Sequence, residues 1–287
     1  MPKQLAVVMI HGIGRQRQDY AARMIRNIEQ QLVVQGYEPD AIAWQPVYWD
    51  DILAPAEKAY LERSLDTASL RAHRLRELVV TVLGDATGYR QLSAERVSAD
   101  ELRVYRVVHE RIQQNIATLY HDQLGSHPVP MVVLAHSFGG HILSNYVWDS
   151  QRRPQQGLSA FERMNWLTGI ITFGCNIPLF TFACPKIVPI SFPPPRLAKR
   201  LKPKARWLNY YDPDDVLAWP LKSVNAAYAR VVSDDRLINV GGAVGNAVVK
   251  AWKASFVQAY LSRLRRWDCS EPQDVDYHLN PAVTLFQ

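Results

Sequence analysis

The sequence MVVLAHSFGG, residues 131–140, decides the fold of this chain. Its first five residues are apolar or small and include adjacent valines, which is typical of a buried parallel strand. A helical pattern follows directly, so Ser137 would lie on a tight strand-to-helix turn that presents its hydroxyl at the end of the sheet. Such a turn needs small residues two positions before and after the serine, and Ala135 and Gly139 satisfy this requirement.

Strands and helices alternate on both sides of this turn. A helix that leads into a buried strand is the crossover unit of a parallel sheet. We therefore expect an α/β fold with a mainly parallel central sheet flanked by helices, in a single domain over residues 1–287. Apolar runs predict further strands at 5–10, 42–49, 167–173, 207–211 and 237–240, and helical spacing predicts helices at 20–35, 99–124, 138–148 and 243–267.

Two segments are longer than this alternation requires. Residues 51–97 are mostly helical in pattern and exceed one crossover, which predicts a helical insertion. Residues 176–205 begin Pro-rich and apolar and end in a basic run, which predicts a lid-like loop beside the site. The alternative, that the apolar residues of this loop simply pack against the core, stays open.

Composition excludes several classes of protein. Hydrophobic residues make up 48% and charged residues 21%, as in an ordinary globular enzyme, and the net charge is +6. No apolar run reaches the ~18 residues that span a bilayer, and no secretory signal pattern is present. The three cysteines form neither a disulfide framework nor a zinc-ligand motif. We expect a cytoplasmic protein without a metal or another cofactor.

The turn at Ser137 resembles the nucleophile elbow of the α/β-hydrolase family, and AHSFGG is similar to the Ala-type elbow of some small bacterial lipases. Ala135 departs from the usual G-x-S-x-G signature by one methyl group. The resemblance implies an α/β-hydrolase fold with Ser137 as nucleophile. It also implies that an acid and then a histidine follow the serine along the chain.

The acid is expected just after a late strand, in WLNYYDPDDVLAWPL, residues 207–221. The DVLAWP run resembles the acid loop of lipases, where the acidic residue precedes a branched apolar pair, and this selects Asp215. Asp212 is the alternative because it lies nearest the predicted strand. A turn or a helix N-cap is a further explanation of the DPDD sequence.

The base is selected by elimination, because of the eight histidines only His278 follows the acid candidates. The C-terminal motif matches imperfectly. When DVDYHLNPAV is aligned through Tyr277 with related hydrolases, Asp274 falls where the family has its base. Either the loop is shifted by one turn and His278 reaches the serine, or the chain has lost its base.

The segment HGIG, residues 11–14, resembles the loop that follows the first strand in lipases and supplies an oxyanion donor. The predicted donors are the backbone N–H groups of Ile13 and Phe138. His11 is expected to brace this loop rather than to move protons. As a phosphate-binding loop, HGIG lacks both the third glycine of the dinucleotide motif and a nearby Lys-Ser/Thr pair.

These features predict a serine hydrolase that cleaves carboxylic esters through an acyl-enzyme, with acyl transfer as a close variant. The alternative belongs to another class: a hydrolase-fold protein without catalysis that works as a binding or scaffold module. The expected partner is a small-molecule or lipid ester, not nucleic acid. The acyl chain length and head group of this substrate and the oligomeric state of the protein stay open. A cluster of basic residues predicts either peripheral contact with an anionic lipid surface or a solvated face. It consists of Arg196, Lys199, Arg200, Lys202, Lys204 and Arg206.

Overall fold

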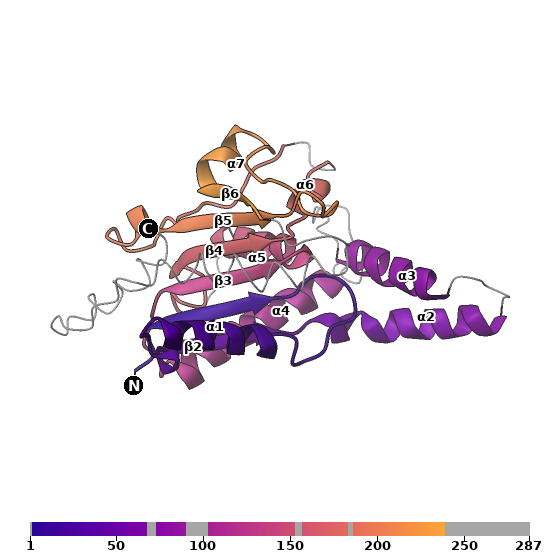
Figure 1. Ribbon diagram of the computed structural model, residues 1–287, viewed down its shortest axis with the longest axis horizontal. Helices are drawn as coiled ribbons and strands as arrows, with labels where there is room; N and C mark the ends of the chain where they lie inside the picture. Colours follow the sequence, from indigo (N-terminus) through magenta and orange to yellow (C-terminus); the bar gives the residue numbers. More distant parts are fainter. Residues whose placement is uncertain (1, 68–72, 90–102, 153–156, 183–185, 239–287) are drawn as a thin grey trace.

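The computed structural model describes residues 2–67, 73–89, 103–152, 157–182 and 186–238 (Figure 1). Within them, six strands form one all-parallel sheet in the order β2-β1-β3-β4-β5-β6. The predicted helix at 243–267 lies outside the described residues, as do His278 and Asp274. The strands are β1 (Leu5–Ile10), β2 (Ile42–Val47), β3 (Met131–His136), β4 (Leu167–Phe173), β5 (Arg206–Tyr211) and β6 (Asp234–Leu237).

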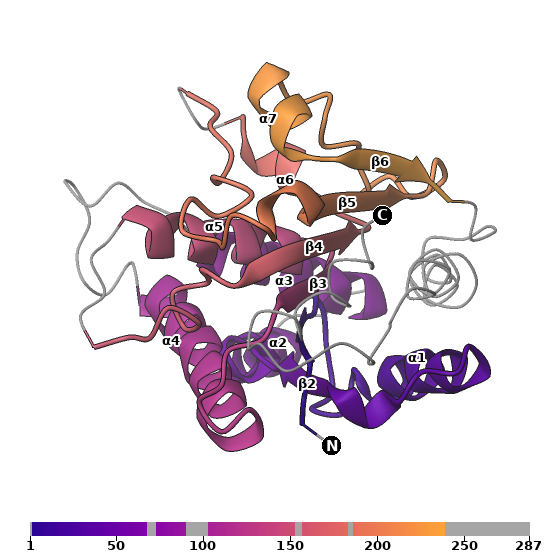
Figure 2. The same ribbon diagram turned by 90° about the vertical axis from the view of Figure 1, so that its left-hand side faces the viewer.

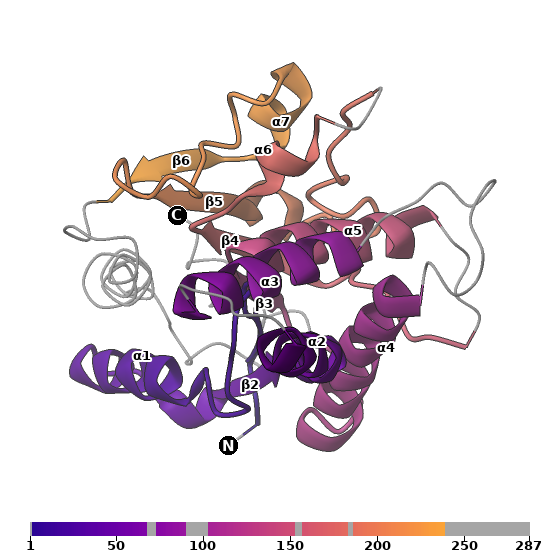
Figure 3. The same cartoon turned by 90° about the vertical axis from the view of Figure 1, so that its right-hand side faces the viewer.

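Helices cover both faces of the sheet, which confirms the predicted α/β architecture (Figures 2 and 3). On one face α1 (Ala22–Val34) packs against β1 through Met24, Ile28 and Leu32. On the other face lie α4 (Arg103–Thr118), which continues as the π-helical turn η3 (Leu119–Gln123), and α5 (Phe138–Arg152). Successive residues of a strand face opposite sides, so β1 must be apolar throughout to meet both layers.

The order of the strands reverses between β1 and β3. The chain passes from β1 to β2 on one side of β1, and β3 pairs with the other side. In open parallel sheets, ligands bind outside the carboxyl ends of the strands at such a switch point. The carboxyl end of β1 leads into His11–Gly14 and that of β3 into Ser137, so topology alone directs attention to these two loops.

Within the predicted insertion, α2 (Ala54–Thr67) and α3 (His73–Gly88) form a hairpin that follows the short η2 turn (Asp50–Ile52). The hairpin projects beyond the carboxyl ends of the strands, in front of β3 when the molecule is viewed along that edge (Figures 1 and 3). It therefore stands beside the switch point.

The predicted lid-like segment crosses the sheet from one end to the other. It begins with α6 (Ile177–Phe180) after the carboxyl end of β4 and ends with η4 (Lys202–Lys204) before β5. The stretch from α6 to Phe182 follows the carboxyl end of β4. Four of the later apolar residues are buried in the core, as the packing alternative predicted for them: Ile190, Phe192, Leu197 and Leu201. Val188, in contrast, is 40% exposed.

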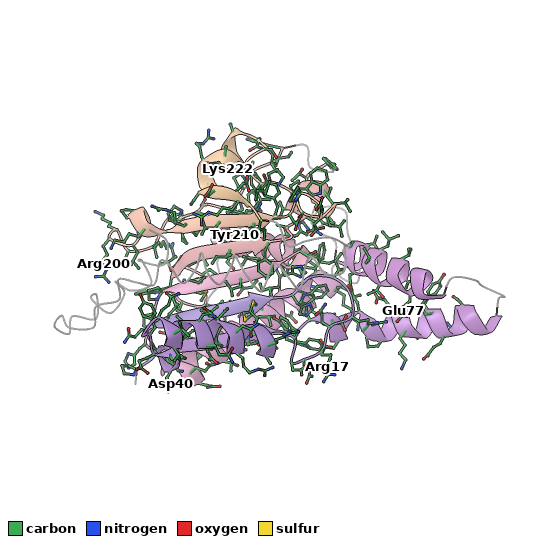
Figure 4. The ribbon with its side chains drawn as sticks, viewed as in Figure 1. Arg17, Asp40, Glu77, Arg200, Tyr210 and Lys222 are labelled. Atoms are coloured by element: carbon green, nitrogen blue, oxygen red, sulfur yellow. The ribbon has the colours of Figure 1, made fainter. Side chains whose placement is uncertain are left out.

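The basic residues at 196–206 lie at the amino end of β5, because η4 directly precedes that strand. Figure 4 shows Arg200 at this end and Glu77 in the helical hairpin at the opposite end. Any anionic surface that these residues bind would therefore contact the end of the molecule opposite Ser137.

The predicted bounds of the last strand were wrong. β6 begins at Asp234 and ends at Leu237, where the sequence predicted 237–240. An apolar run was the signal used, whereas this strand is polar and its side chains anchor its neighbours. Asp235 Oδ1 accepts hydrogen bonds from Asn209 Nδ2 at 2.7 Å and from the Leu221 N–H at 2.9 Å. The remaining short elements are η1 (Pro39–Ala41), which precedes β2, and α7 (Ala226–Val231), which precedes β6.

Candidate active site

Ser137 forms a one-residue turn between β3, which ends at His136, and α5, which begins at Phe138. Its φ is +51°, a left-handed conformation that costs an L-residue roughly 1–2 kcal/mol. The turn is held by its backbone: the Ser137 N–H donates to the Phe173 carbonyl at 2.9 Å, and the Ser137 carbonyl accepts from the Gly140 N–H at 3.0 Å. The side chain is half-buried. Its hydroxyl has no hydrogen-bond partner among the residues that the structure describes.

Two glycines allow the loop after β1 to lie against this turn. A Cβ on Gly139 would lie 2.5 Å from the Ile10 carbonyl oxygen and 2.6 Å from that of His11. A Cβ on Gly12 would lie 2.7 Å from the Ser137 Cβ. Both glycines are therefore required for close approach, and this approach brings the HGIG loop next to the serine.

His11 fixes the conformation of the HGIG loop. Its Nε2 accepts the Trp49 N–H at 3.1 Å, so the ring proton must be on Nδ1, which donates to the Gly12 carbonyl at 2.8 Å. The ring stacks on the Trp49 indole with centroids 5.0 Å apart. Burial lowers the pKa of His11 to about 4, so the imidazole is neutral near neutral pH. His11 is a brace, as predicted from the sequence, with both ring nitrogens occupied.

The brace also orients the predicted oxyanion donor. In a trans peptide the carbonyl and the following N–H point in opposite directions, so fixing the Gly12 carbonyl also fixes the Ile13 N–H. The second predicted donor, the Phe138 N–H, belongs to the first residue of α5 and has no acceptor within the helix. The positive end of the helix dipole adds to its attraction for a negative charge.

The two acid candidates have different roles in the loop after β5. The Asp212 carboxylate is buried and builds the turn: its Oδ1 accepts the Asp214 N–H at 2.9 Å, and its carbonyl accepts the Asp215 N–H at 3.1 Å. Asp215 uses only Oδ1, which accepts the Leu217 N–H at 3.0 Å. Its Oδ2 has no partner within the described part of the chain.

Asp215 Oδ2 faces the ends of the central strands. A Cβ built on Gly174, just after β4, would lie 3.6 Å from this oxygen and 3.4 Å from His136 Nε2. Gly174 has a φ of +58°. The carboxylate of Asp215 and the residue before Ser137 thus border the same small space, while Asp212 is engaged in the turn. The geometry favours Asp215 over Asp212 as an orienting acid.

None of the described histidines is hydrogen-bonded to the Ser137 hydroxyl. The His136 ring stacks on Phe173 with centroids 5.2 Å apart, and burial lowers its pKa to about 4. His141 lies one turn into α5, stacks on Phe180 with centroids 4.4 Å apart, and burial lowers its pKa to about 4 as well. His278 and Asp274 lie outside the described residues, so the assignment of the base stays a prediction.

Sequence reasoning missed two buried carboxyl groups beside the HGIG loop. Asp85 of α3 is 1% exposed, and its Oδ2 accepts the Gly14 N–H at 3.1 Å. Glu57 of α2 is 7% exposed, and its Oε2 lies 3.7 Å from Arg15 Nη1. Burial raises the pKa of Glu57 to about 7 and that of Asp85 to about 6. No local motif marks them, since both lie in a helical pattern far along the chain from residues 11–14.

Three further features bear on function within the described residues: the reactivity of a thiol, metal-binding clusters and membrane-spanning helices. Cys175 is fully buried, which raises the pKa of its thiol to about 12, so a reactive thiolate does not form near neutral pH. The described residues contain no group of three or more His, Cys, Asp or Glu side chains placed to hold a metal ion. None of the described helices combines the length and the apolar character needed to cross a membrane.

No protein-family model matches this chain, and no curated protein matches its sequence. The geometry at the switch point is therefore the basis on which a function can be proposed.

Proposed function

We propose that this protein is a serine hydrolase of the α/β-hydrolase fold that cleaves carboxylic esters through an acyl-enzyme on Ser137. The observation that carries the proposal is the position of this serine. It is held at a φ of +51° at the carboxyl end of a central strand, with a glycine loop packed against its Cβ. A strained, partly exposed serine at the topological switch point of a parallel sheet is the arrangement of a nucleophile elbow.

The order of parts along the chain also supports the α/β-hydrolase fold. The candidate oxyanion loop follows β1, the nucleophile follows β3, and the candidate acid follows β5, all at the same end of one parallel sheet. This is the family's order of nucleophile before acid.

In the proposed reaction, the Ser137 hydroxyl oxygen attacks the ester carbonyl carbon. The N–H groups of Ile13 and Phe138 donate to the carbonyl oxygen as it gains negative charge. His278 accepts the serine proton and returns it to the departing alcohol, while Asp215 Oδ2 accepts a hydrogen bond from the imidazole. Water then attacks the acyl-enzyme by the same route and releases the carboxylic acid. Attack by an alcohol instead would give acyl transfer.

Exposed apolar side chains near the acid loop support an ester with an apolar acyl or alcohol part. Val216 is 69% exposed, Leu217 40% and Trp219 43%, all directly after Asp215, and Phe182 after α6 is 81% exposed. These residues follow the carboxyl ends of β4 and β5. An apolar substrate that binds there would cover them and gain hydrophobic free energy.

The second candidate is a hydrolase-fold binding or scaffold module without catalysis. Two observations favour it: no described histidine is hydrogen-bonded to the Ser137 hydroxyl, and Asp274 occupies the position where the family resemblance expects the base.

Labelling with a fluorophosphonate probe distinguishes the two candidates. We expect the probe to attach to Ser137 in the wild-type protein, to be absent in Ser137→Ala, and to be retained in Ser144→Ala, a matched change on the same helix. A well-folded wild-type protein that takes up no probe would establish the module instead.

The same assay tests the base. Removal of a general base costs roughly 10²–10⁴-fold in rate, so His278→Ala should label at least about a hundredfold more slowly. Unchanged labelling in His278→Ala would exclude His278. A large gain in the labelling rate of Asp274→His would show that the base position is residue 274.

A further inference from the structure

Glu57 and Asp85 connect the α2–α3 hairpin to the HGIG loop. Asp85 accepts the Gly14 N–H, and Glu57 pairs with Arg15, so both partners belong to the loop that follows β1. Gly14 has a φ of +97°, which an L-residue rarely adopts. Gly84 of α3 leaves room for the Glu57 carboxyl, because a Cβ on Gly84 would collide with Glu57 Oε1.

Three of the four oxygens of this carboxyl pair lack a hydrogen-bond donor as carboxylates. Among the described residues, Glu57 Oε1, Glu57 Oε2 and Asp85 Oδ1 are buried without a hydrogen-bond partner, although Arg15 lies 3.7 Å from Glu57 Oε2, while Asp85 Oδ2 accepts the Gly14 N–H. Unpaired buried oxygens are costly, and two carboxylates cannot donate to each other. A single proton on Glu57 supplies the missing donor and allows Asp85 to stay ionised.

The surrounding charges favour the same protonation state. Among the residues that the structure describes, the charged groups that face the pair are Asp50 of η2, which is 5% exposed, and Arg15, so three acidic groups there share one cation. Asp50 in turn lies 3.5 Å from the Tyr48 hydroxyl through its Oδ2. Full ionisation would place three negative charges against one positive charge in a buried region, and like charges in such a region favour the uptake of a proton.

We propose that Glu57 and Asp85 are positioning residues that share one proton and so hold the HGIG loop against Ser137. The α2–α3 hairpin thereby sets the pH range in which the oxyanion donors are in place. This inference rests on the proposed function, since it concerns how the same site is regulated.

The pH dependence follows from the two ionisations. Burial and Asp85 raise the pKa of Glu57 to about 7, so the shared proton is lost to solvent above this pH and the two carboxylates repel. Burial raises the pKa of Asp85 to about 6, so below this pH the acceptor of the Gly14 N–H becomes neutral and holds it more weakly. The loop is best held between these values.

The test compares fluorophosphonate labelling rates of the wild-type protein and Glu57→Gln from about pH 5.5 to about pH 9. The glutamine amide donates to Asp85 at every pH and cannot ionise. With a pKa near 7, about one wild-type molecule in ten keeps the proton at pH 8. We therefore expect equal rates at pH 6.5 and about tenfold faster labelling of Glu57→Gln at pH 8.

Glu62→Gln on the exposed face of α2 is the matched control and should follow the wild-type profile. Asp85→Asn is a second variant, because the asparagine side chain offers an acceptor to the Gly14 N–H and a donor to Glu57. Its labelling rate should therefore not fall between about pH 6.5 and about pH 8, as for Glu57→Gln.

The outcomes separate this inference from the proposed function. The carboxyl-pair inference alone is overturned if the wild-type protein is labelled but its labelling rate does not fall at alkaline pH. It is also overturned if the rate falls at alkaline pH in Glu57→Gln or in Asp85→Asn as it does in the wild-type protein. A wild-type protein that is unlabelled at every pH overturns the proposed function, and the inference with it.

Discussion

The two ends of the parallel sheet use glycine for different reasons. At the amino end, Gly36 after α1 and Gly157 before β4 have φ values of +81° and +82°, and nothing lies within 4 Å of a Cβ built on either. At the carboxyl end, a Cβ on Gly12, Gly139 or Gly140 would lie within 2.8 Å of a neighbouring atom. Gly36 and Gly157 at the amino end permit only a backbone conformation. At the carboxyl end, Gly14 and Gly174 also have positive φ, but Gly12, Gly139 and Gly140 permit close contact between segments.

Charge differs between the two ends as well. Basic side chains are exposed at the amino end, in the segment that includes Arg196, Lys199 and Arg200. At the carboxyl end, charged groups are buried and their pKa values are shifted, as for Glu57 and Asp85. Perturbed groups and tight loop contacts at one end of a sheet are typical of a functional site. Substitutions at the carboxyl end should therefore change activity, and those at the amino end only stability.

The largest effect is expected for Asp215→Asn. Replacing the orienting carboxylate of a triad leaves the geometry intact but lowers turnover by about 10⁴-fold, because the imidazole adopts the wrong tautomer. We expect labelling of Ser137 to slow by a factor of that order, with unchanged unfolding in urea. Asp212→Asn is the matched change, and its side chain can still accept the Asp214 N–H. Equal losses in the two variants would contradict the separate roles of these aspartates.

The next largest loss of function or stability is expected for Gly139→Ala. Its methyl group would meet two backbone carbonyl oxygens, at 2.5 and 2.6 Å, which cannot move without shifting β1 or α5. We expect a loss of about 3 kcal/mol in the free energy of unfolding, measured in urea, and slower labelling in whatever fraction stays folded. An alanine variant with wild-type stability and labelling would show that the loop after β1 does not pack against the elbow as described.

Glu57→Gln should change stability in a pH-dependent way. A carboxyl group whose pKa is raised on folding destabilises the folded state as pH rises from its unfolded pKa of about 4.3 to its folded pKa of about 7. The variant lacks this penalty, so we expect it to be about 3–4 kcal/mol more stable than the wild-type protein at pH 8. The difference should disappear below about pH 4. Urea unfolding at both pH values measures it, and a difference that does not vary with pH would argue against a raised pKa.

The smallest effect is expected for Gly36→Ala. The position is open, so only the strain of a positive φ opposes the methyl group, at a cost of about 1 kcal/mol. The rate of Ser137 labelling should not change. A large loss of activity in this variant would show that the amino end of the sheet is coupled to the site.

Much of the sheet could be predicted from the sequence, because buried parallel strands are continuous apolar runs with few competing interpretations. The β1 run, the β3–Ser137–α5 turn and the β4 run all form as expected. β2 contains Pro46, which has no N–H to donate, and lies at the edge of the described sheet. β6 was placed wrongly because its residues are polar and its stability comes from side chains such as Asp235.

The candidate site was predictable only in part. Local motifs indicated Ser137 and the HGIG loop, since each depends on a few adjacent residues. The resemblance of the DVLAWP run selected Asp215 and left Asp212 as the alternative, because sequence does not reveal which carboxylate closes the turn and which lies near Gly174. Glu57 and Asp85 were missed altogether: their contact with Gly14 and Arg15 joins segments more than forty residues apart, and helical periodicity carries no information about it.

Trapping of the covalent intermediate tests the central claim most directly. The protein would be mixed with p-nitrophenyl butyrate, quenched in acid within the first turnover, and analysed by intact-mass and peptide mass spectrometry. We predict one butyryl group per chain, attached to Ser137 and missing from Ser137→Ala. Hydrolysis without an acyl adduct, or an adduct on another residue, would contradict an acyl-enzyme at this elbow.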